Sequence, residues 1–88
     1  MNNPEQHSVV ARIMILLRES LFLDLSSTDI DLVEGGVIDS AGFMELFILL
    51  EDEFGIEIEL GDLNLDHFRT VERMASFVIG KQNKEVNR

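Results

Sequence analysis

Apolar residues recur at helical spacing in three stretches of this chain, and that periodicity limits the possible folds more than any other feature of the sequence. The stretches cover residues 5–22, 41–54 and 71–80. Strand-like alternation occurs only at 56–60, where a single short strand would have no partner. We therefore expect an all-α fold, a small four-helix bundle with three main helices, one short helix near 61–68 and a long loop between the first two main helices.

Each main helix has one apolar face and recognisable ends. The Asn-Pro-Glu sequence at residues 3–5 favours a helix start, Gly55 is a C-cap signal for the second helix, and Thr70 caps the third. Gly80 is expected to end the third helix and the polar tail 81–88 to fray. The predicted core faces are Val9, Ile13, Leu16, Leu17 and Ser20 in the first helix, Phe43, Leu46, Phe47, Leu50 and Phe54 in the second, and Val71, Met74, Ala75 and Val78 in the third, with Phe77 and Ile79 beside them.

The two connections between these helices must be held by their own apolar side chains. Residues 23–39 are longer than most loops of compact domains. Residues 56–60 read as an extended connector, and Asp62 or Asn64 is expected to cap the short helix that follows. The expected anchors are Leu25, Ile30, Leu32, Val37 and Ile38 in the first connection, and Ile56, Ile58 or Leu60 with Leu63, Leu65 and Phe68 in the second.

The acids of the long loop do not follow the EF-hand pattern, which leaves weak binding of divalent cations to the clustered acids as the alternative, and the histidines do not indicate a metal site. An EF-hand loop needs glycine at its sixth position and glutamate at its twelfth, but a loop starting at Asp24 has Asp29 and Gly35 there. His7 and His67 have no second ligand at helical spacing and are interpreted as surface or loop-packing residues. We therefore expect no metal centre.

Composition narrows the function classes. The chain is long enough for one domain, expected to span 1–88 with about 5–80 ordered. Its 17 acidic and 7 basic residues give a net charge of −10, which disfavours nucleic acids and anionic membranes and suits partners with basic patches. Without cysteine, any thiol chemistry must come from a prosthetic group. No signal peptide or membrane-spanning run is recognised, and a cytoplasmic monomer is expected.

Ser40 lies where the second amphipathic stretch begins, directly after the sequence Gly36-Val37-Ile38-Asp39. Unpaired N–H groups and the helix dipole favour an anion at such a position. Two compatible interpretations follow. Ser40 is the N-cap of the helix, or it is the attachment point of a phosphate-linked group.

A second apolar strip lies well round the same helix from its core face. Ala41, Met44 and Ile48 form this strip, and Glu45 and Asp52 flank it on the polar side. Apolar contact gives affinity and charge gives orientation, so the pattern indicates a docking surface. The alternative is a broad core face with scattered exposed apolar residues, which are common on proteins.

The stretch around Ser40 resembles the prosthetic-group site of acyl and peptidyl carrier proteins. In that family an Asp-Ser pair opens the second helix, and the serine carries 4′-phosphopantetheine. The resemblance covers nearly the whole chain, including the Phe-Gly-Ile sequence at 54–56 and the Thr-Val sequence at 70–71. The matching residues at the site are Gly36, Asp39, Ser40, Glu45 and Leu46, followed by residues 50–56.

The resemblance implies transport rather than catalysis. A phosphopantetheinyl transferase would use coenzyme A and Mg²⁺ to modify Ser40, with Asp39 helping to position the metal and phosphate. The arm would end in a thiol that holds an acyl or aminoacyl group as a thioester. A loading ligase and downstream acyl-processing enzymes with basic patches would be its partners. The docking residues would be Ala41, Met44, Glu45, Ile48 and Asp52.

The residues after the serine depart from the fatty-acid carriers, which commonly have leucine and then a polar residue there. Ala41-Gly42 is more similar to D-alanyl carrier proteins and to some freestanding aminoacyl or peptidyl carriers. The large Phe43 would also fill space that a long acyl chain needs. We therefore expect a specialised carrier that a dedicated adenylating ligase loads with a short or amino acid.

Two other functions remain as alternatives. The first is an acidic helical adaptor that binds a basic partner without any prosthetic group, with Ser40 acting only as a cap. The second is a small hydrolase using Ser40 with a histidine. It is disfavoured because no oxyanion glycine motif follows the serine and no local pattern ties a histidine to it.

Overall fold

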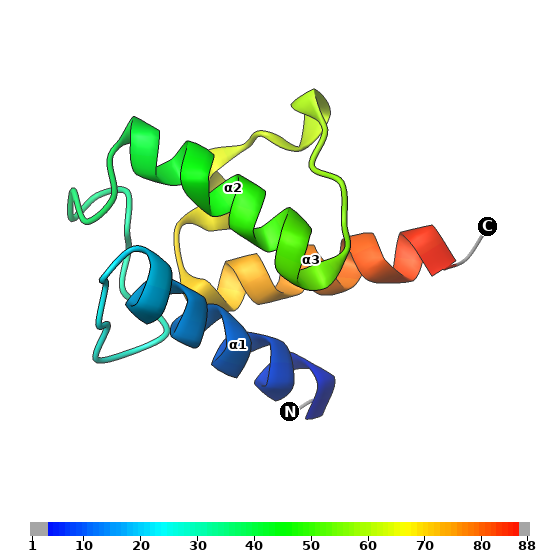
Figure 1. Ribbon diagram of the computed structural model, residues 1–88, viewed down its shortest axis with the longest axis horizontal. Coiled ribbons are helices and arrows are strands. Elements are labelled where there is room, and N and C mark those ends of the chain that lie inside the picture. Colours follow the sequence, from blue (N-terminus) through cyan, green and yellow to red (C-terminus); the bar gives the residue numbers. More distant parts are fainter. Residues whose placement is uncertain (1–3, 87–88) are drawn as a thin grey trace.

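The computed structural model describes residues 4–86, and all regular structure in that range is helical. Three helices form the body, and two short 3-10 helices lie between the second and third (Figure 1). The elements are α1 Pro4–Ser20, α2 Ser40–Phe54, η1 Leu60–Asp62, η2 Leu65–Phe68 and α3 Val71–Val86. The all-α prediction is confirmed, with two 3-10 turns where one short helix was expected. No helix in the described range is long and apolar enough to span a bilayer.

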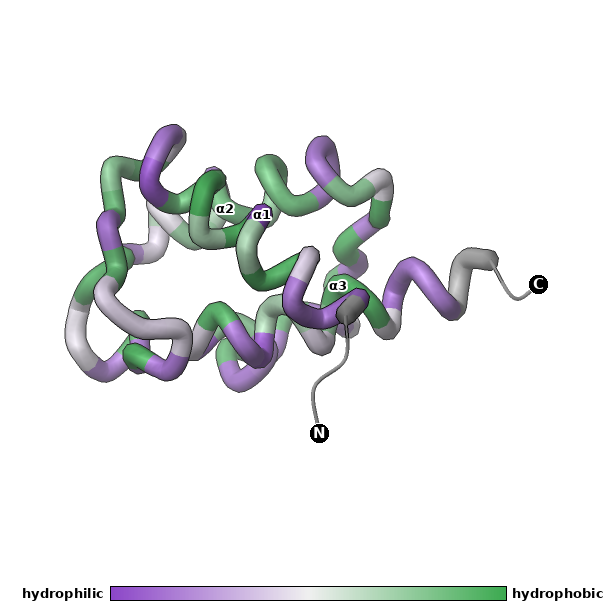
Figure 2. The backbone as a smooth tube through the Cα atoms, turned by 90° about the horizontal axis from the view of Figure 1, so that it is seen from below, coloured by the Kyte–Doolittle hydropathy of each residue, from purple (hydrophilic) through white to green (hydrophobic). Residues whose placement is uncertain are grey.

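The hydrophobic core lies where the three long helices meet, and Phe68 at the end of η2 is fully buried in it. Its ring centre lies 4.8 Å from that of Phe47 on α2 and 5.1 Å from that of Phe77 on α3. Apolar and polar residues alternate along each helix, as expected when one face is buried (Figure 2). The buried side chains are Val9, Ile13, Leu17, Leu32, Ile38, Phe43, Leu46, Leu50, Ile56, Phe68, Val71, Met74, Ala75 and Val78, whereas Leu16, Ser20, Phe47 and Phe54 of the predicted core faces are only partly buried.

Helix α1 ends at Ser20, two residues before the predicted end. The cause is Phe22, whose φ of 58° lies in the left-handed region and reverses the chain. The Leu23 N–H group closes this turn by donating to the Leu17 carbonyl at 2.9 Å. A left-handed conformation costs a non-glycine residue about 1–2 kcal/mol, and Phe22 is 87% exposed, so burial of its ring does not offset that cost.

Helix α3 does not end at Gly80, and the prediction of a stop there is wrong. The helix continues to Val86, and the last residues of the chain, 87 and 88, lie outside the described residues. Glycine in a helix costs only about 1 kcal/mol relative to alanine, and contacts made beyond Gly80 hold this turn in place. Lys81 Nζ lies 2.8 Å from Asp62 Oδ2, and Gln82 Nε2 donates to the Phe54 carbonyl at 3.3 Å.

The long loop is anchored as predicted, although to different depths. Leu32 and Ile38 are buried. Leu25, Ile30 and Val37 are partly buried and pack against the core. These contacts make the loop a fixed part of the fold, so the chain arrives at the start of α2 in a defined position.

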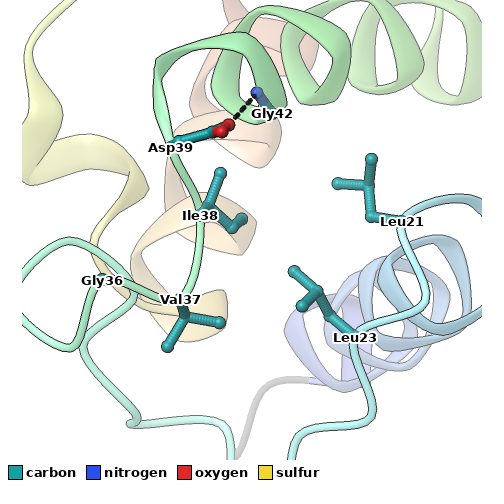
Figure 3. A pocket seen from close by; sticks show the side chains of 7 residues that line it. All are labelled: Leu21, Leu23, Gly36, Val37, Ile38, Asp39 and Gly42. Atoms are coloured by element: carbon teal, nitrogen blue, oxygen red, sulfur yellow. Dashed lines mark hydrogen bonds between the residues drawn. The ribbon is translucent and has the colours of Figure 1, made fainter.

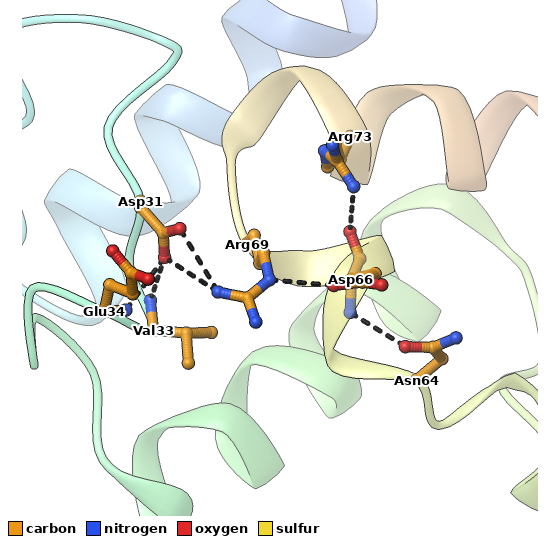
Figure 4. A network of polar contacts seen from close by, with 7 residues as sticks. All are labelled: Asp31, Val33, Glu34, Asn64, Asp66, Arg69 and Arg73. Atoms are coloured by element: carbon orange, nitrogen blue, oxygen red, sulfur yellow. Dashed lines mark hydrogen bonds and ion pairs between the residues drawn. The ribbon is translucent and has the colours of Figure 1, made fainter.

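Arg69 ties the same loop to the corner between η2 and α3 (Figure 4). Its Nη1 atom lies 3.2 Å from Asp31 Oδ2, and its Nε atom lies 2.8 Å from Asp66 Oδ1. Its carbonyl accepts a hydrogen bond from the Leu32 N–H group at 2.7 Å. Side chain and backbone of one residue therefore both hold the loop.

The second connection is anchored only in part as predicted. Ile56 and Phe68 are buried, and Ile58 is partly buried. Leu60, the third alternative for the connector, is 88% exposed, and the predicted anchoring by Leu63 and Leu65 is wrong, since they are 46% and 48% exposed. Phe68 occupies the core at this corner, and the short 3-10 turns leave the leucines outside it. Asn64 caps η2 as expected, with its Oδ1 accepting from the Asp66 N–H group at 3.0 Å.

We expect the Arg69 network to stabilise the fold less at acidic pH. The hydrogen bond from the Glu34 N–H group lowers the pKa of Asp31, and Val33 N–H and Arg69 add to this. The hydrogen bond from Arg69 lowers the pKa of Asp66. A carboxylate whose folded pKa lies below its ordinary 3.8 contributes stability above pH 3.8 and loses it as the pH falls through the lowered value. Asp31→Asn should therefore flatten the fall in unfolding free energy below pH 3.8.

Urea denaturation from neutral pH to below pH 3.8 measures this difference. Asp66→Asn should flatten the profile in the same pH window, because it removes the other carboxylate that contacts Arg69. Profiles of both variants that run parallel to the parent profile throughout would contradict the prediction.

Candidate functional site

Asp39, rather than Ser40, caps helix α2, so the interpretation of Ser40 as the N-cap is wrong. The Asp39 backbone is extended, with φ −91° and ψ −177°, and its Oδ1 atom accepts a hydrogen bond from the Gly42 N–H group at 2.8 Å. Its carbonyl accepts from the Phe43 N–H group at 3.0 Å. Aspartate caps a helix as well as serine does, and the helix begins one residue earlier than the predicted 41.

Ser40 is therefore the first residue of the helix, and its side chain is exposed. Within the described part of the chain its hydroxyl makes no hydrogen bond, and the N–H groups of Ser40 and Ala41 make none either. The first turn of α2 carries no acidic residue. Two N–H donors at the positive end of a helix, beside an exposed hydroxyl, fit a phosphate ester attached to that hydroxyl. The adjacent Asp39 carboxylate is engaged by the Gly42 N–H group.

Gly42 is required by the packing at this corner. A Cβ atom on it would lie 2.7 Å from the Ile38 Cγ2 atom and 3.3 Å from the Asp39 Oδ1 atom. Ile38 is buried, and its Cγ2 methyl branches directly from Cβ, so it cannot swing aside easily. The glycine that departs from the fatty-acid carrier pattern thus keeps the capping aspartate and the loop anchor close together.

Gly42→Ala is expected to destabilise the protein by about 1–2 kcal/mol, because overpacking at Ile38 outweighs the helix propensity that alanine gains. Gly80→Ala is the matched control. It lies inside α3, where nothing is within 4 Å of an added Cβ. There the same change should stabilise by about 0.5–1 kcal/mol. Urea denaturation measures the change in unfolding free energy for both variants. Stabilisation by Gly42→Ala would contradict the packing argument.

The five predicted docking residues all lie on the outer surface of α2. Met44 is 58% exposed and Ile48 56%, and Ala41, Glu45 and Asp52 are also exposed. Glu45 and Asp52 form no ion pair with any side chain that the structure describes. The helix therefore presents two large apolar side chains and two uncompensated carboxylates to solvent on the side away from the core.

Sequence reasoning missed a cavity of about 260 Å³ that is lined in part by Asp39 and Gly42, on either side of Ser40 and Ala41 in the sequence. Figure 3 shows its lining residues. The cavity lies between the end of α1 and the segment that enters α2. The lining residues are Leu21, Leu23, Gly36, Val37, Ile38, Asp39 and Gly42. Only the positive φ of Gly36, 64°, follows a signal visible in the sequence, a glycine pair.

The histidines take no part in the Ser40 site. His7 is exposed on α1, and His67 packs against Phe77 with ring centres 5.2 Å apart, which confirms its interpretation as a loop-packing residue. Among the described residues neither imidazole hydrogen-bonds Ser40, so the geometry of a serine hydrolase is not present there. The described acids do not converge either, since no group of three or more potential ligands could hold a metal ion.

Known proteins resemble this chain along most of its length. The family model described as "Phosphopantetheine attachment site" matches residues 11–78. The D-alanyl carrier protein of Streptococcus sanguinis (strain SK36) is 29% identical over 76 residues, which cover 85% of this chain and 96% of that protein. The D-alanyl carrier protein of Streptococcus gordonii (strain Challis) is 30% identical over 76 residues with the same coverage.

The solved structure of KstB-PCP(apo) agrees with this chain with a TM-score of 0.69 at 33% identity, over 91% of this chain and 90% of that one. Fold and sequence thus lead to the same family. The chain belongs to the phosphopantetheine-attachment family and is a carrier protein that holds an acyl or aminoacyl group on a covalently bound 4′-phosphopantetheine.

Proposed function

We propose that Ser40 is the residue that carries the 4′-phosphopantetheine. The observation that supports it most is that capping and the exposed hydroxyl belong to two different residues at the start of α2. Asp39 already caps the helix, which leaves the exposed Ser40 hydroxyl without a structural task. The Ser40 oxygen would displace adenosine bisphosphate from coenzyme A to form a phosphodiester, and its proton would leave to the transferase or solvent.

The N–H groups of Ser40 and Ala41, which have no hydrogen-bond partner among the described residues, would stabilise the resulting negative charge. The second proposed role belongs to Asp39, whose exposed carboxylate uses Oδ1 for the cap. Its Oδ2 atom remains to position Mg²⁺ and phosphate during attachment. When bound, the prosthetic group supplies the thiol that this cysteine-free chain lacks.

The proposed partners are a phosphopantetheinyl transferase, a loading ligase and later acyl-processing enzymes. All of them would bind the apolar strip of Ala41, Met44 and Ile48 together with its flanking acids, Glu45 and Asp52. The uncompensated acids of the strip and the net charge of −10 suit basic patches on these enzymes. The chain acts as a single non-catalytic carrier domain and works as a cytoplasmic monomer.

The proposed cargo is a short or amino acid. Two observations support this choice. Relatives with a matching sequence include D-alanyl carrier proteins, and Phe43, Phe47 and Phe68 pack together in and beside the core next to α2. Loading by an adenylating ligase with a small amino acid tests the cargo. Efficient elongation of an attached acyl chain by fatty-acid synthase enzymes would contradict it.

Attachment is tested by intact mass after incubation with coenzyme A, Mg²⁺ and a broad-specificity phosphopantetheinyl transferase. The expected result is a gain of one phosphopantetheinyl group, which peptide mapping places on Ser40. A folded sample that gains no mass with several transferases would overturn the proposal and favour the adaptor without a prosthetic group.

A further inference from the structure

The cavity beside Ser40 is built from two segments that are distant in the sequence. Leu21 and Leu23, just after α1, form one wall, and Val37 and Ile38, just before α2, form the other (Figure 3). Gly36 completes the lining together with Asp39 and Gly42, which lie on either side of Ser40 and Ala41 in the sequence. The cavity thus opens beside the helix start rather than on the docking strip further along α2.

Phe22, the non-glycine residue with a positive φ among those described, lies between two residues that line this cavity. Phe22 has a left-handed backbone and an exposed ring, and its two neighbours, Leu21 and Leu23, both line the cavity. The chain turns at Phe22 directly after α1. In an extended chain, too, the two neighbours of a residue point to the side opposite to it. Leu21 and Leu23 form an apolar wall there that is only partly buried.

We propose that this cavity holds the pantoyl part of the prosthetic arm, with its paired methyl groups against Leu21, Leu23 and Val37. The inference rests on the proposed attachment at Ser40. In 4′-phosphopantetheine the paired methyls follow directly after the phosphate, so an arm tethered at Ser40 brings them to the nearest apolar surface. Tethering makes the contact intramolecular, and even weak apolar burial can then hold the arm.

Size and lining chemistry select this part of the arm. The volume of about 260 Å³ lies just below the roughly 300–1,000 Å³ of pockets that bury drug-sized molecules, so the cavity takes a segment and not the whole arm. The pantoyl segment carries methyl groups together with a hydroxyl and an amide. The aliphatic walls meet the methyls, and Asp39 and the Gly36 backbone offer polar partners. The thiol end then extends outside, where partner enzymes reach the cargo.

Nuclear magnetic resonance on the isotope-labelled protein, with and without the arm, tests the placement. Intact mass first establishes complete modification. We expect nuclear Overhauser effects from the paired methyls to the methyl groups of Leu21, Leu23 and Val37. We also expect amide shift changes at these residues, far from Ser40 in the sequence. Shift changes confined to residues 39–42, or contacts to other parts of the fold only, would overturn the inference. Failure to modify the protein would reject the attachment proposal instead, before any spectrum is compared.

A pair of variants sharpens the test. Leu23→Phe fills the cavity from a partly exposed position and should remove the contacts between the arm and Leu21 and Val37 while leaving attachment complete. Leu25→Phe is the matched control, because Leu25 is a partly buried leucine of the same loop that does not line the cavity. Contacts that persist in Leu23→Phe would contradict the inference, and the parent spectra decide it if that variant fails to fold.

Discussion

Ser40→Ala is expected to abolish phosphopantetheine attachment while changing the free energy of unfolding by less than about 0.5 kcal/mol. The variant removes the oxygen that forms the phosphodiester. It leaves the α2 cap intact, because the hydrogen bond to the Gly42 N–H group comes from Asp39. Alanine is also the best helix former, so the first turn should not weaken. Intact mass measures the attachment, and urea denaturation measures the stability.

Ser8→Ala is the control for removal of an exposed hydroxyl, since Ser8 lies on α1 away from the start of α2. It should be modified fully. Attachment to Ser40→Ala would show that another hydroxyl is used, and a stability loss near 1 kcal/mol would assign Ser40 a capping role after all.

The two proposed tasks of Asp39 can be separated in the same assay. Asp39→Ala should lose the cap and about 1 kcal/mol of stability. Asp39→Asn keeps an Oδ1 acceptor for the Gly42 N–H group and should retain the stability, but it removes the charge proposed to position metal and phosphate. If Asp39→Asn is as stable as the parent but is modified slowly, the role of Asp39 in the attachment reaction is distinct from its role as helix cap.

The residue that caps α2 could be predicted from the sequence only to within one position. The sequence places Asp39 and Ser40 at a helix start, because the apolar period begins directly after them. Asp and Ser are equally good caps, so propensity does not decide which one takes the Gly42 N–H group. In the structure Asp39 takes it, at a corner where Ile38 is buried and leaves no room for a Cβ at Gly42. That is a packing contact, and packing is not visible in spacing.

The glycines illustrate the same limit. Gly55 and Gly80 both follow an apolar helical stretch and both resemble stops. Gly55 takes a φ of 64° and ends α2, whereas α3 passes through Gly80 because Lys81 and Gln82 find partners on distant segments. The tie between Asp31 and Arg69 likewise joins residues 38 positions apart. Periodicity predicts faces, but long-range polar contacts fix the ends and loops.

The cavity beside Ser40 was beyond sequence reasoning for a related reason. Phe22, a residue with no sequence preference for the left-handed region, turns the chain between the two leucines that line this cavity. Leu21 and Leu23, to which the sequence pattern assigned no role in the site, then face the entrance to α2.

Met44→Glu is expected to lower kcat/KM of a phosphopantetheinyl transferase for this protein by about 10- to 100-fold, as loss of a central apolar contact does at interfaces. Met44 is 58% exposed on α2, one turn from Ser40, so the change removes apolar contact without opening the core. Ile15→Glu is the matched control. It adds the same charge to an apolar residue that is 45% exposed on α1, and kcat/KM should stay near the parent value.

The acids that flank the strip, Glu45 and Asp52, should increase the rate at which partners associate rather than add to the contact area. Glu45→Lys is expected to lower kcat/KM most at low ionic strength and to weaken its dependence on salt, because a charge facing a basic patch steers association and is screened by ions. Glu19→Lys on α1 makes the same change in net charge away from the strip and should preserve the salt dependence of the parent. Equal losses in Met44→Glu and Ile15→Glu, or equal salt profiles in both lysine variants, would mean that net charge governs recognition. In that case α2 would hold Ser40 in place without serving as the surface that partners read.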